Sequence, residues 1–107
     1  MEIIETPVFT DWVCKTLKDE DYMEFQFALM EHPDMGDLIP GGHGLRKVRW
    51  KIPGKGKGKR GGVRIIYYWF VKESQILLLL AYEKAEKGNL TAREIKLLRE
   101  IVEREMK

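Results

Sequence analysis

Two long apolar runs, at residues 63–71 and 75–82, constrain the fold of this chain more than any other feature. The first run is rich in β-branched and aromatic residues, and the second is almost wholly apolar. Only Lys72, Glu73 and Ser74 separate them, so they are predicted to be neighbouring strands of a meander. Because neither run alternates with polar residues, we expect the central strand to be buried on both faces.

A third strand pattern precedes these runs, in the segment from Leu45 to Ile52. Its apolar positions are Val48, Trp50 and Ile52. Its cations recur at every second position between them: Lys47, Arg49 and Lys51. This alternation predicts a strand with one apolar face and one cationic face. A loop from Pro53 to Gly62, in which glycine and lysine almost alternate, joins it to the next strand as a hairpin.

The N-terminal segment begins with Ile3 and Ile4, a β-tolerant apolar pair that Pro7 closes, and this predicts a first strand. Thr10 can then cap a helix that continues through Lys18. The N-terminal part of the chain is therefore expected to contribute one strand and at least one helix.

A second helix is predicted from the acidic cluster at Asp19 to about His32. One apolar stripe along it consists of Tyr22, Phe25 and Leu29. A second stripe consists of Met23, Phe27 and Met30. Together the two stripes make a wide apolar face, which we expect a sheet to cover.

The C-terminal helix has the clearest boundary. Thr91 and Glu94 have the spacing of a capping box, and Leu90 and Ile95 stand where a hydrophobic staple would place them. We predict a helix from Thr91 to Met106. The chain of 107 residues is thus expected to form one α+β domain, residues 1–107. Its element order is β-α-α-β-β-β-α, with the helices packed on a small antiparallel or mixed sheet of about four strands.

Charge is strongly segregated along the chain. The segment from Leu38 to Lys72 contains ten of the 19 Lys and Arg residues and none of the 17 Asp and Glu residues. The formal net charge of +2 hides this local positive field. A polyanion is the expected partner, and nucleic acid is the favoured one.

Other classes of function have little support in the sequence. No apolar stretch approaches the roughly twenty residues that cross a bilayer, and the N-terminus lacks the cations of a secretory signal, so no membrane partner and a cytoplasmic location are expected. Cys14 is the single cysteine and is expected to be a buried thiol; neither it nor the two histidines has a ligand cluster, so no metal or other cofactor is expected. A nucleotide-phosphate cradle is also disfavoured, because a strand pattern and not a helix follows the glycine-rich loop.

Five residues are candidates for a functional groove. Lys47 and Arg49 stand on one strand face about 7 Å apart, which is close to the spacing of successive phosphates along an extended strand. Arg64 is the only charged residue in its run; it is either a buried paired group or the floor of a groove, and the lack of a nearby acid favours the groove. Tyr82 and Lys84 share one strand parity and reach the end of the groove, unless the tyrosine only packs on the final helix.

A second set of cations is expected to contact a nucleic-acid backbone. Its members are Arg46, Lys51, Lys55, Lys57, Lys59 and Arg60. Most of them belong to the glycine-rich loop, which can act as a cationic finger along a nucleic-acid backbone. The alternative is a solvated hairpin tip whose lysines guard a strand edge.

Three motifs in this order resemble the RelE/ParE superfamily of bacterial toxins, and most closely the HigB-like branch of RelE. They are Gly-Leu-Arg-Lys-Val-Arg-Trp at 44–50, Gly-Lys-Arg-Gly-Gly-Val-Arg-Ile-Ile-Tyr-Tyr-Trp at 58–69, and Ala-Tyr-Glu-Lys at 81–84 with Asn-Leu-Thr at 89–91. The resemblance covers nearly the whole chain. It implies the toxin of a type II toxin-antitoxin system, a ribosome-dependent mRNA endonuclease that cleaves codons in the ribosomal A site.

The resemblance also implies partners and roles. The first partner is the ribosome with its mRNA and rRNA. The second is an antitoxin encoded beside the toxin, which is expected to be a helix-turn-helix protein. Operator DNA is expected to be bound only through this antitoxin. Lys47 is then a base or charge stabiliser, and Arg49 and Arg64 are phosphate clamps. Tyr82 and Lys84 position the substrate or protonate the leaving group.

Alternatives remain open at this point. His43, in a glycine-rich turn, is a further acid-base candidate without supporting residues around it. A ParE-type inhibitor of DNA gyrase shares the fold but not the catalytic cations. A noncatalytic nucleic-acid-binding module would use the same groove only to hold a backbone.

Overall fold

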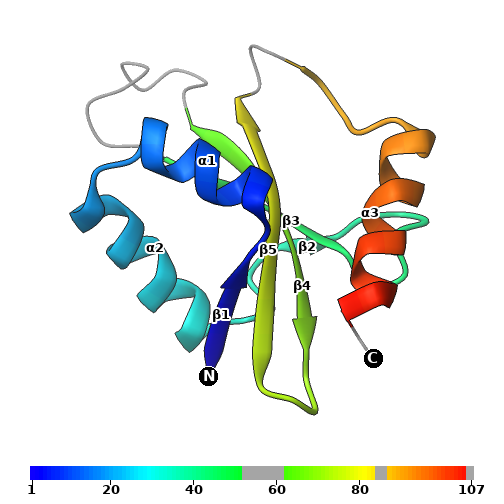
Figure 1. The fold of residues 1–107 in the computed structure, drawn as a ribbon, viewed down its shortest axis with the longest axis horizontal. Coiled ribbons are helices and arrows are strands. Elements are labelled where there is room, and N and C mark those ends of the chain that lie inside the picture. The colour runs from blue at the N-terminus through cyan, green and yellow to red at the C-terminus, as the bar shows by residue number, and fades with distance from the viewer. Residues whose placement is uncertain (52–61, 84–86, 106–107) are drawn as a thin grey trace.

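The computed structural model describes residues 1–51, 62–83 and 87–105 of the chain. Its elements are β1 (Glu2–Glu5), α1 (Pro7–Thr16), α2 (Asp19–Glu31), β2 (Asp37–Leu38), β3 (Arg46–Trp50), β4 (Val63–Phe70), β5 (Gln75–Glu83) and α3 (Ala92–Glu105) (Figure 1). The strands form one mixed sheet in the order β1-β5-β4-β3-β2, in which β1 runs parallel to β5 and the other pairs are antiparallel. The predicted α+β class and the meander β3-β4-β5 are confirmed.

The sheet has five strands in the described part of the chain, not about four, because a short strand precedes the meander. Strand β2 has two residues, Asp37 and Leu38, which pair with Lys47 and Arg46 of β3. Two residues cannot show a period-two pattern, so this strand has no signature in the sequence.

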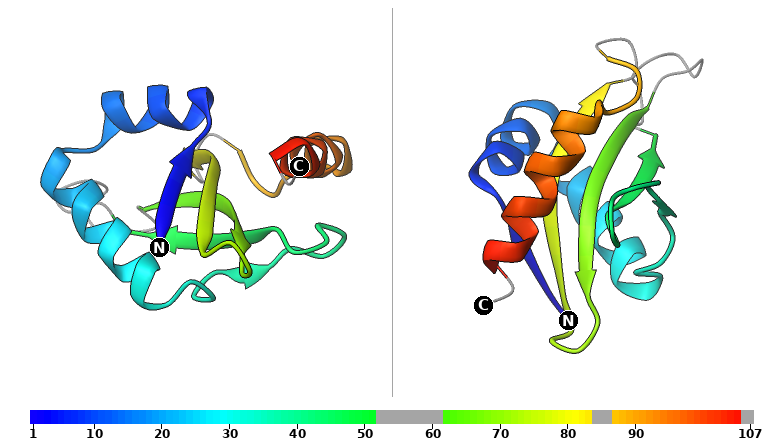
Figure 2. Two further views of the ribbon diagram at one scale, coloured as in Figure 1. Left: turned by 60° about the horizontal axis from the view of Figure 1, so that its bottom comes forward. Right: turned by 90° about the vertical axis from the view of Figure 1, so that its right-hand side faces the viewer.

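The helices cover opposite faces of the sheet. Figures 1 and 2 show α1 and α2 on one side and α3 on the other. Each side has its own buried cluster: Phe9, Phe25 and Leu29 pack with Ile65 and Tyr67 on the first side. On the second side, the α3 residues Leu98 and Val102 belong to a cluster with Leu45, Ile66, Phe70, Leu77, Leu79 and Tyr82. The central strand β4 thus contributes to both cores, as its unbroken apolar run predicts.

Helix α1 begins four residues before the predicted start and ends at Thr16, two residues before the predicted end at Lys18. Thr6, not Thr10, is its N-cap: the Thr6 Oγ1 accepts a hydrogen bond from the Phe9 backbone N–H at 3.1 Å and donates one to the Leu79 carbonyl at 2.9 Å. Pro7 occupies the first turn, where its missing N–H costs nothing. The prediction that Pro7 ends the strand was sound, but the same proline also starts the helix.

The boundaries of α2 and the start of α3 agree with the sequence, and the predicted last residue of α3, Met106, lies outside the described residues. Helix α2 begins at Asp19 with three acids in its first turn and ends at Glu31. In α3 the capping box is formed in both directions: the Thr91 N–H donates to Glu94 Oε1 at 2.8 Å, and the Glu94 N–H donates to Thr91 Oγ1 at 3.1 Å. This reciprocal cap satisfies two backbone donors that would otherwise lack partners.

The segment between α2 and β3 is hydrogen-bonded to the side of the sheet that α1 and α2 cover. The Tyr67 hydroxyl donates to the Pro33 carbonyl at 2.6 Å and accepts from the Gly36 N–H at 3.0 Å. Gly36 lies so close that a Cβ there would stand 2.9 Å from the Tyr67 ring and 3.0 Å from the Lys47 carbonyl oxygen. Only glycine therefore allows this approach of the backbone to the sheet.

Two expectations about side-chain burial were wrong. Cys14 is exposed on α1 and is not a buried thiol. The sheet covers only one of the two apolar stripes of α2: Phe25 and Leu29 are fully buried, whereas Met23 and Phe27 are 52% and 58% exposed. The two stripes lie on opposite sides of the helix, and one flat sheet cannot reach both. No helix in the described residues is both long and apolar enough to span a membrane.

Candidate active site

Three of the predicted site residues form a row across three neighbouring strands. Arg49 of β3 pairs with Arg64 of β4, and Arg64 pairs with Tyr82 of β5. Residues directly opposite each other in antiparallel strands project from the same face, with Cβ atoms about 4.5–5.5 Å apart. Tyr82 belongs to the cluster beneath α3, so the row lies on the α3 side of the sheet. The register thus brings together residues that are up to 33 positions apart in the sequence.

Lys47 extends the row along β3. It lies two residues before Arg49, so it projects from the same face about 7 Å away. Next to it the surface is hollowed, in a cavity of about 450 Å³ that is also lined by Leu38, Leu90 and Ile95. Lys47 is half-buried there, whereas Arg49 is exposed. The cationic face predicted for this strand is therefore exposed to solvent at Arg49 and borders the cavity at Lys47.

Arg64 is the most unusual member of the row. It is only 9% exposed, and within the described residues its guanidinium has neither a hydrogen bond nor an ion pair. A second cation, Arg49, stands directly opposite it. Like charges in cross-strand pairs are destabilising, so the pair of Arg49 and Arg64 has an electrostatic cost. The described residues supply no acid to pair with Arg64, which disfavours the buried ion pair.

Tyr82 adds a buried hydroxyl to this cationic environment. The residue is 5% exposed, and its hydroxyl has no hydrogen-bond partner among the described residues. Burial raises its pKa, and the positive charges of Arg64 and Lys87 oppose this effect. The hydroxyl therefore keeps its proton at neutral pH. The two expectations for Tyr82 are both met in part, since it packs in the core beneath α3 and also stands beside Arg64.

A lysine that the sequence did not single out lies near Tyr82. Lys87 Nζ is held by both carboxylate oxygens of Glu94 at 2.8 Å. The hydrogen bond from Lys87, followed by the one from the Thr91 backbone, lowers the pKa of Glu94. The capping box was predicted, but no local pattern indicated that its glutamate would also bind a lysine seven residues earlier. This contact depends on how the segment before α3 folds back.

Of the other predicted cations, the two that the structure describes do not join the row. Arg46 points to the opposite face, because it shares the parity of Val48, and its Nη1 donates to the carbonyls of Asp34 at 3.2 Å and Gly36 at 2.7 Å. Lys51 is exposed directly after β3. The remaining predicted cations lie outside the described residues: Lys55, Lys57, Lys59, Arg60 and Lys84.

His43 also lies apart from the row. It is exposed in the turn before β3, at a positive φ of 52°. It lines a small cavity with Tyr68, Arg99 and Glu103. Lys47, Arg49, Arg64 and Tyr82 do not line that cavity.

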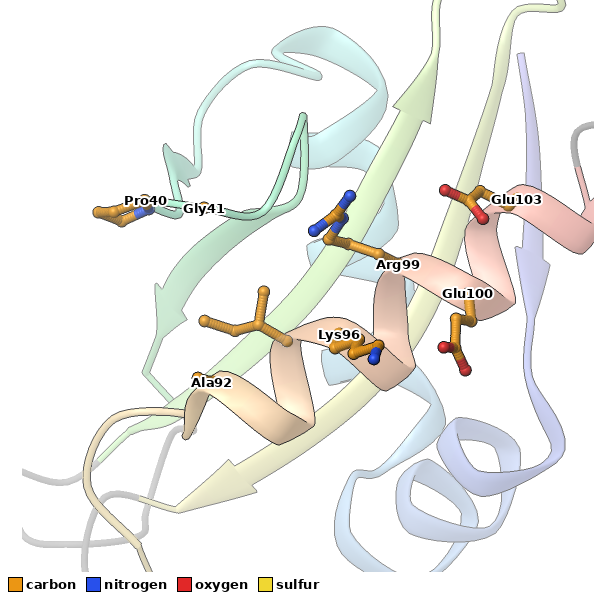
Figure 3. Close-up of a pocket in the computed structure, with 8 residues that line it drawn as sticks. Pro40, Gly41, Ala92, Lys96, Arg99, Glu100 and Glu103 are labelled. Atoms are coloured by element: carbon orange, nitrogen blue, oxygen red, sulfur yellow. The ribbon is translucent and has the colours of Figure 1, made fainter.

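A groove of about 430 Å³ separates α3 from the turn before β3. Figure 3 shows Pro40 and Gly41 on one wall and Lys96 and Arg99 on the other, with the Arg99 side chain directed toward the turn. Ile95 and Pro40 line both this groove and the cavity beside Lys47. The α3 side of the sheet thus offers a continuous hollow surface that leads to Lys47.

In the described residues, no group of three or more His, Cys, Asp or Glu side chains is arranged to hold a metal ion. No protein-family model matches the chain. The chemistry of the site therefore has to be argued from its own side chains.

Proposed function

We propose that this protein is the toxin of a type II toxin-antitoxin system, a ribosome-dependent mRNA endonuclease that cleaves mRNA in the ribosomal A site. The observation that carries the proposal is the row of Arg49, Arg64 and Tyr82, extended by Lys47, in which Arg64 has no hydrogen bond or ion pair within the described residues. Asp37 of β2 pairs with Lys47, and a phosphodiester would supply negative charge to Arg49 and Arg64. The motifs that resemble the RelE family support the same function.

The proposed reaction is attack of a ribose 2′-hydroxyl on the adjacent phosphorus. Lys47 is the proposed base that takes the proton of the 2′-hydroxyl, or the group that stabilises the developing negative charge. Arg49 and Arg64 stabilise the charge that develops on the phosphorane, which is the electrostatic part of the catalysis. The O2′–P bond forms, the P–O5′ bond breaks, and an acid gives a proton to the 5′-oxygen, leaving a 2′,3′-cyclic phosphate.

Tyr82 and Lys84 are the proposed acids or positioning groups for the leaving 5′-oxygen. The raised pKa of Tyr82 suits an acid, since the hydroxyl retains its proton until the leaving group needs it. Its burial requires that α3 shift or that the proton pass through an intervening group. The ribosome is proposed to position the message for in-line attack, because a site built mainly of cations orients a substrate poorly.

The proposed partners follow from this function. They are the ribosome with mRNA and rRNA, and a cognate antitoxin with a helix-turn-helix domain, which alone would contact operator DNA. The cations at 55–60 are proposed to grip ribosomal RNA.

Primer extension on a translated message, after induction of the protein in growing bacteria, tests the proposal. Wild type is expected to produce cleavages within codons, and Arg64→Ala is expected to abolish both cleavage and growth arrest. Arg104→Ala, at an exposed position on α3, is the matched control and is expected to remain active. Arg64→Met checks folding: it keeps an extended side chain at this largely buried position and removes the charge opposite Arg49, so it should not lower the midpoint of thermal unfolding.

Three results would count against the proposal. Full toxicity of Arg64→Ala would refute the placement of the site. Intact messages with blocked DNA replication would favour the gyrase inhibitor. Intact messages and normal replication would favour a noncatalytic nucleic-acid-binding module.

A further inference from the structure

Helix α2 presents an apolar stripe that the rest of the described chain leaves uncovered. Its inner side, with Phe25 and Leu29, is fully buried against the sheet. Met23 and Phe27 lie roughly opposite that side, one helical turn apart, and more than half of each side chain is exposed. Two large apolar side chains at four-residue spacing form the kind of surface that a partner helix packs against.

Carboxylates border this stripe. Glu20, Glu24 and Glu31 are all exposed and repeat at intervals of four and seven residues, so they follow one side of the stripe. The chain from Asp19 to Leu45 contains seven Asp and Glu residues and no Lys or Arg. The surface is therefore apolar in the middle and negative along its edge.

The stripe lies on the side of the sheet opposite α3 (Figures 1 and 2). The row of Arg49, Arg64 and Tyr82 lies on the α3 side. The protein thus has a cationic site on one face and an acidic apolar surface on the other. An occupant of α2 does not need to compete with a ligand of the row, so the inference that follows is independent of the proposed enzymatic function.

We infer that this face of α2 binds a partner protein through an amphipathic helix that carries Lys or Arg along one edge of its apolar side. The carboxylates repel RNA, DNA and anionic lipid surfaces, which leaves a protein of opposite charge as the complementary occupant. The apolar stripe favours a helix laid along it, with apolar residues at three- and four-residue spacing.

A second copy of this chain fits the surface less well. On the described part of α3, Leu97 is the one large apolar side chain that is highly exposed. Although Arg93 and Arg104 flank it, one leucine cannot cover both Met23 and Phe27. The partner is therefore expected to be a different protein, with a longer apolar face.

Binding of a fluorescent model peptide tests the apolar part of the inference. The probe is a synthetic helix of about 15 residues with leucine on one face and lysine along its edges, a length near the minimum for a stable isolated helix. Fluorescence anisotropy should show binding to wild type, weakened about tenfold or more by Met23→Ser with Phe27→Ser. Val71→Ser, at another exposed apolar position in the turn between β4 and β5, is the matched control and should bind like wild type.

The charged part of the inference needs a second comparison. Glu20→Gln with Glu24→Gln should weaken binding at low salt and flatten its dependence on salt concentration. A peptide with glutamate in place of every lysine should not bind. These two results would separate complementary charge from unspecific adsorption of an apolar helix.

Equal binding of the lysine peptide to wild type and to the double serine variant would overturn the inference. So would equal binding of the glutamate peptide. Sedimentation velocity of the free protein provides the last check: a dimer that Phe27→Ser dissociates would assign the surface to a second copy and contradict the proposed occupant.

Discussion

The Tyr82 hydroxyl is buried without a hydrogen-bond partner among the described residues, and the neighbouring Arg64, 9% exposed, has no ion pair there. Charged and hydroxyl groups lose hydration when they are buried, and the loss is offset only by hydrogen bonds or opposite charge. Here neither is supplied by the described residues. Such residues are retained where a ligand provides the missing partner, and this is the physical reason for placing the proposed chemistry at this row.

Tyr82→Phe separates the two roles of this residue. Removing a buried hydroxyl that has no partner should raise the free energy of unfolding by about 1 kcal/mol or leave it unchanged, since no described hydrogen bond is lost. If Tyr82 acts as acid or positioning group, cleavage should fall at the same time. Urea unfolding and primer extension on the same variant measure both effects, and a clear loss of stability would show that the hydroxyl has a partner in solution.

At the scale of elements, capping residues determine where each helix begins. Thr6 caps α1 and also ties it to β5 through the Leu79 carbonyl, whereas Thr10 lies inside the helix and its hydroxyl donates to Glu5 at 2.5 Å. Thr10 was the predicted cap, whereas Pro7 at the first helical position marks Thr6 as the residue that precedes the helix.

Substitution of the two threonines tests this assignment. Thr6→Ala should lower the free energy of unfolding by about 1–2 kcal/mol, because it removes a cap and a hydrogen bond between elements. Thr10→Ala, at an exposed site, should cost less. Urea denaturation of both variants gives the comparison, and a larger loss for Thr10→Ala would contradict the observed start of α1.

The start of α3 should make stability depend on pH. The pKa of Glu94 is lowered by its hydrogen bonds with Lys87 and with the Thr91 backbone, so its contribution is present above the unfolded value of 4.5 and is lost as pH falls below it. Glu94→Gln should therefore be less stable than wild type at pH 7, and the two should converge at acid pH. Thermal unfolding across this range checks the prediction, which fails if the difference is constant with pH.

At the scale of the whole molecule, the sheet separates two surfaces of opposite character. One side carries Lys47 and the row, and the other carries α2 with its acids and exposed stripe. A net charge of +2 describes neither side. Association with ribosomes is expected to depend on the cationic side and on the basic loop, and therefore to weaken steeply as salt increases.

Lys57→Ala tests the contribution of the basic loop. Each phosphate contact removed should reduce the slope of log affinity against log salt by about one. The variant should therefore bind ribosomes more weakly at low salt, with the difference shrinking as salt increases, while cleavage by bound enzyme is retained. Co-sedimentation with ribosomes over a salt series measures the slope. An unchanged slope would show that Lys57 makes no phosphate contact with the ribosome.

The sequence by itself determined the features that depend on neighbouring residues. Strand alternation, unbroken apolar runs and the capping box at Thr91 and Glu94 are fixed within a few positions, and these elements formed as predicted. The same alternation places Arg46 on the face opposite Lys47, although its charge alone suggested a shared role.

Only the tertiary structure decided which distant residues meet. The pairing of Arg49 with Arg64 and of Arg64 with Tyr82 is set by strand register, which depends on how whole strands pack. The exposure of Met23 and Phe27, the pairing of Lys87 with Glu94 and the two-residue strand β2 likewise depend on where layers come to lie. Local patterns specify what a segment becomes, whereas burial and register arise from contacts between segments, and the candidate site is made of such contacts.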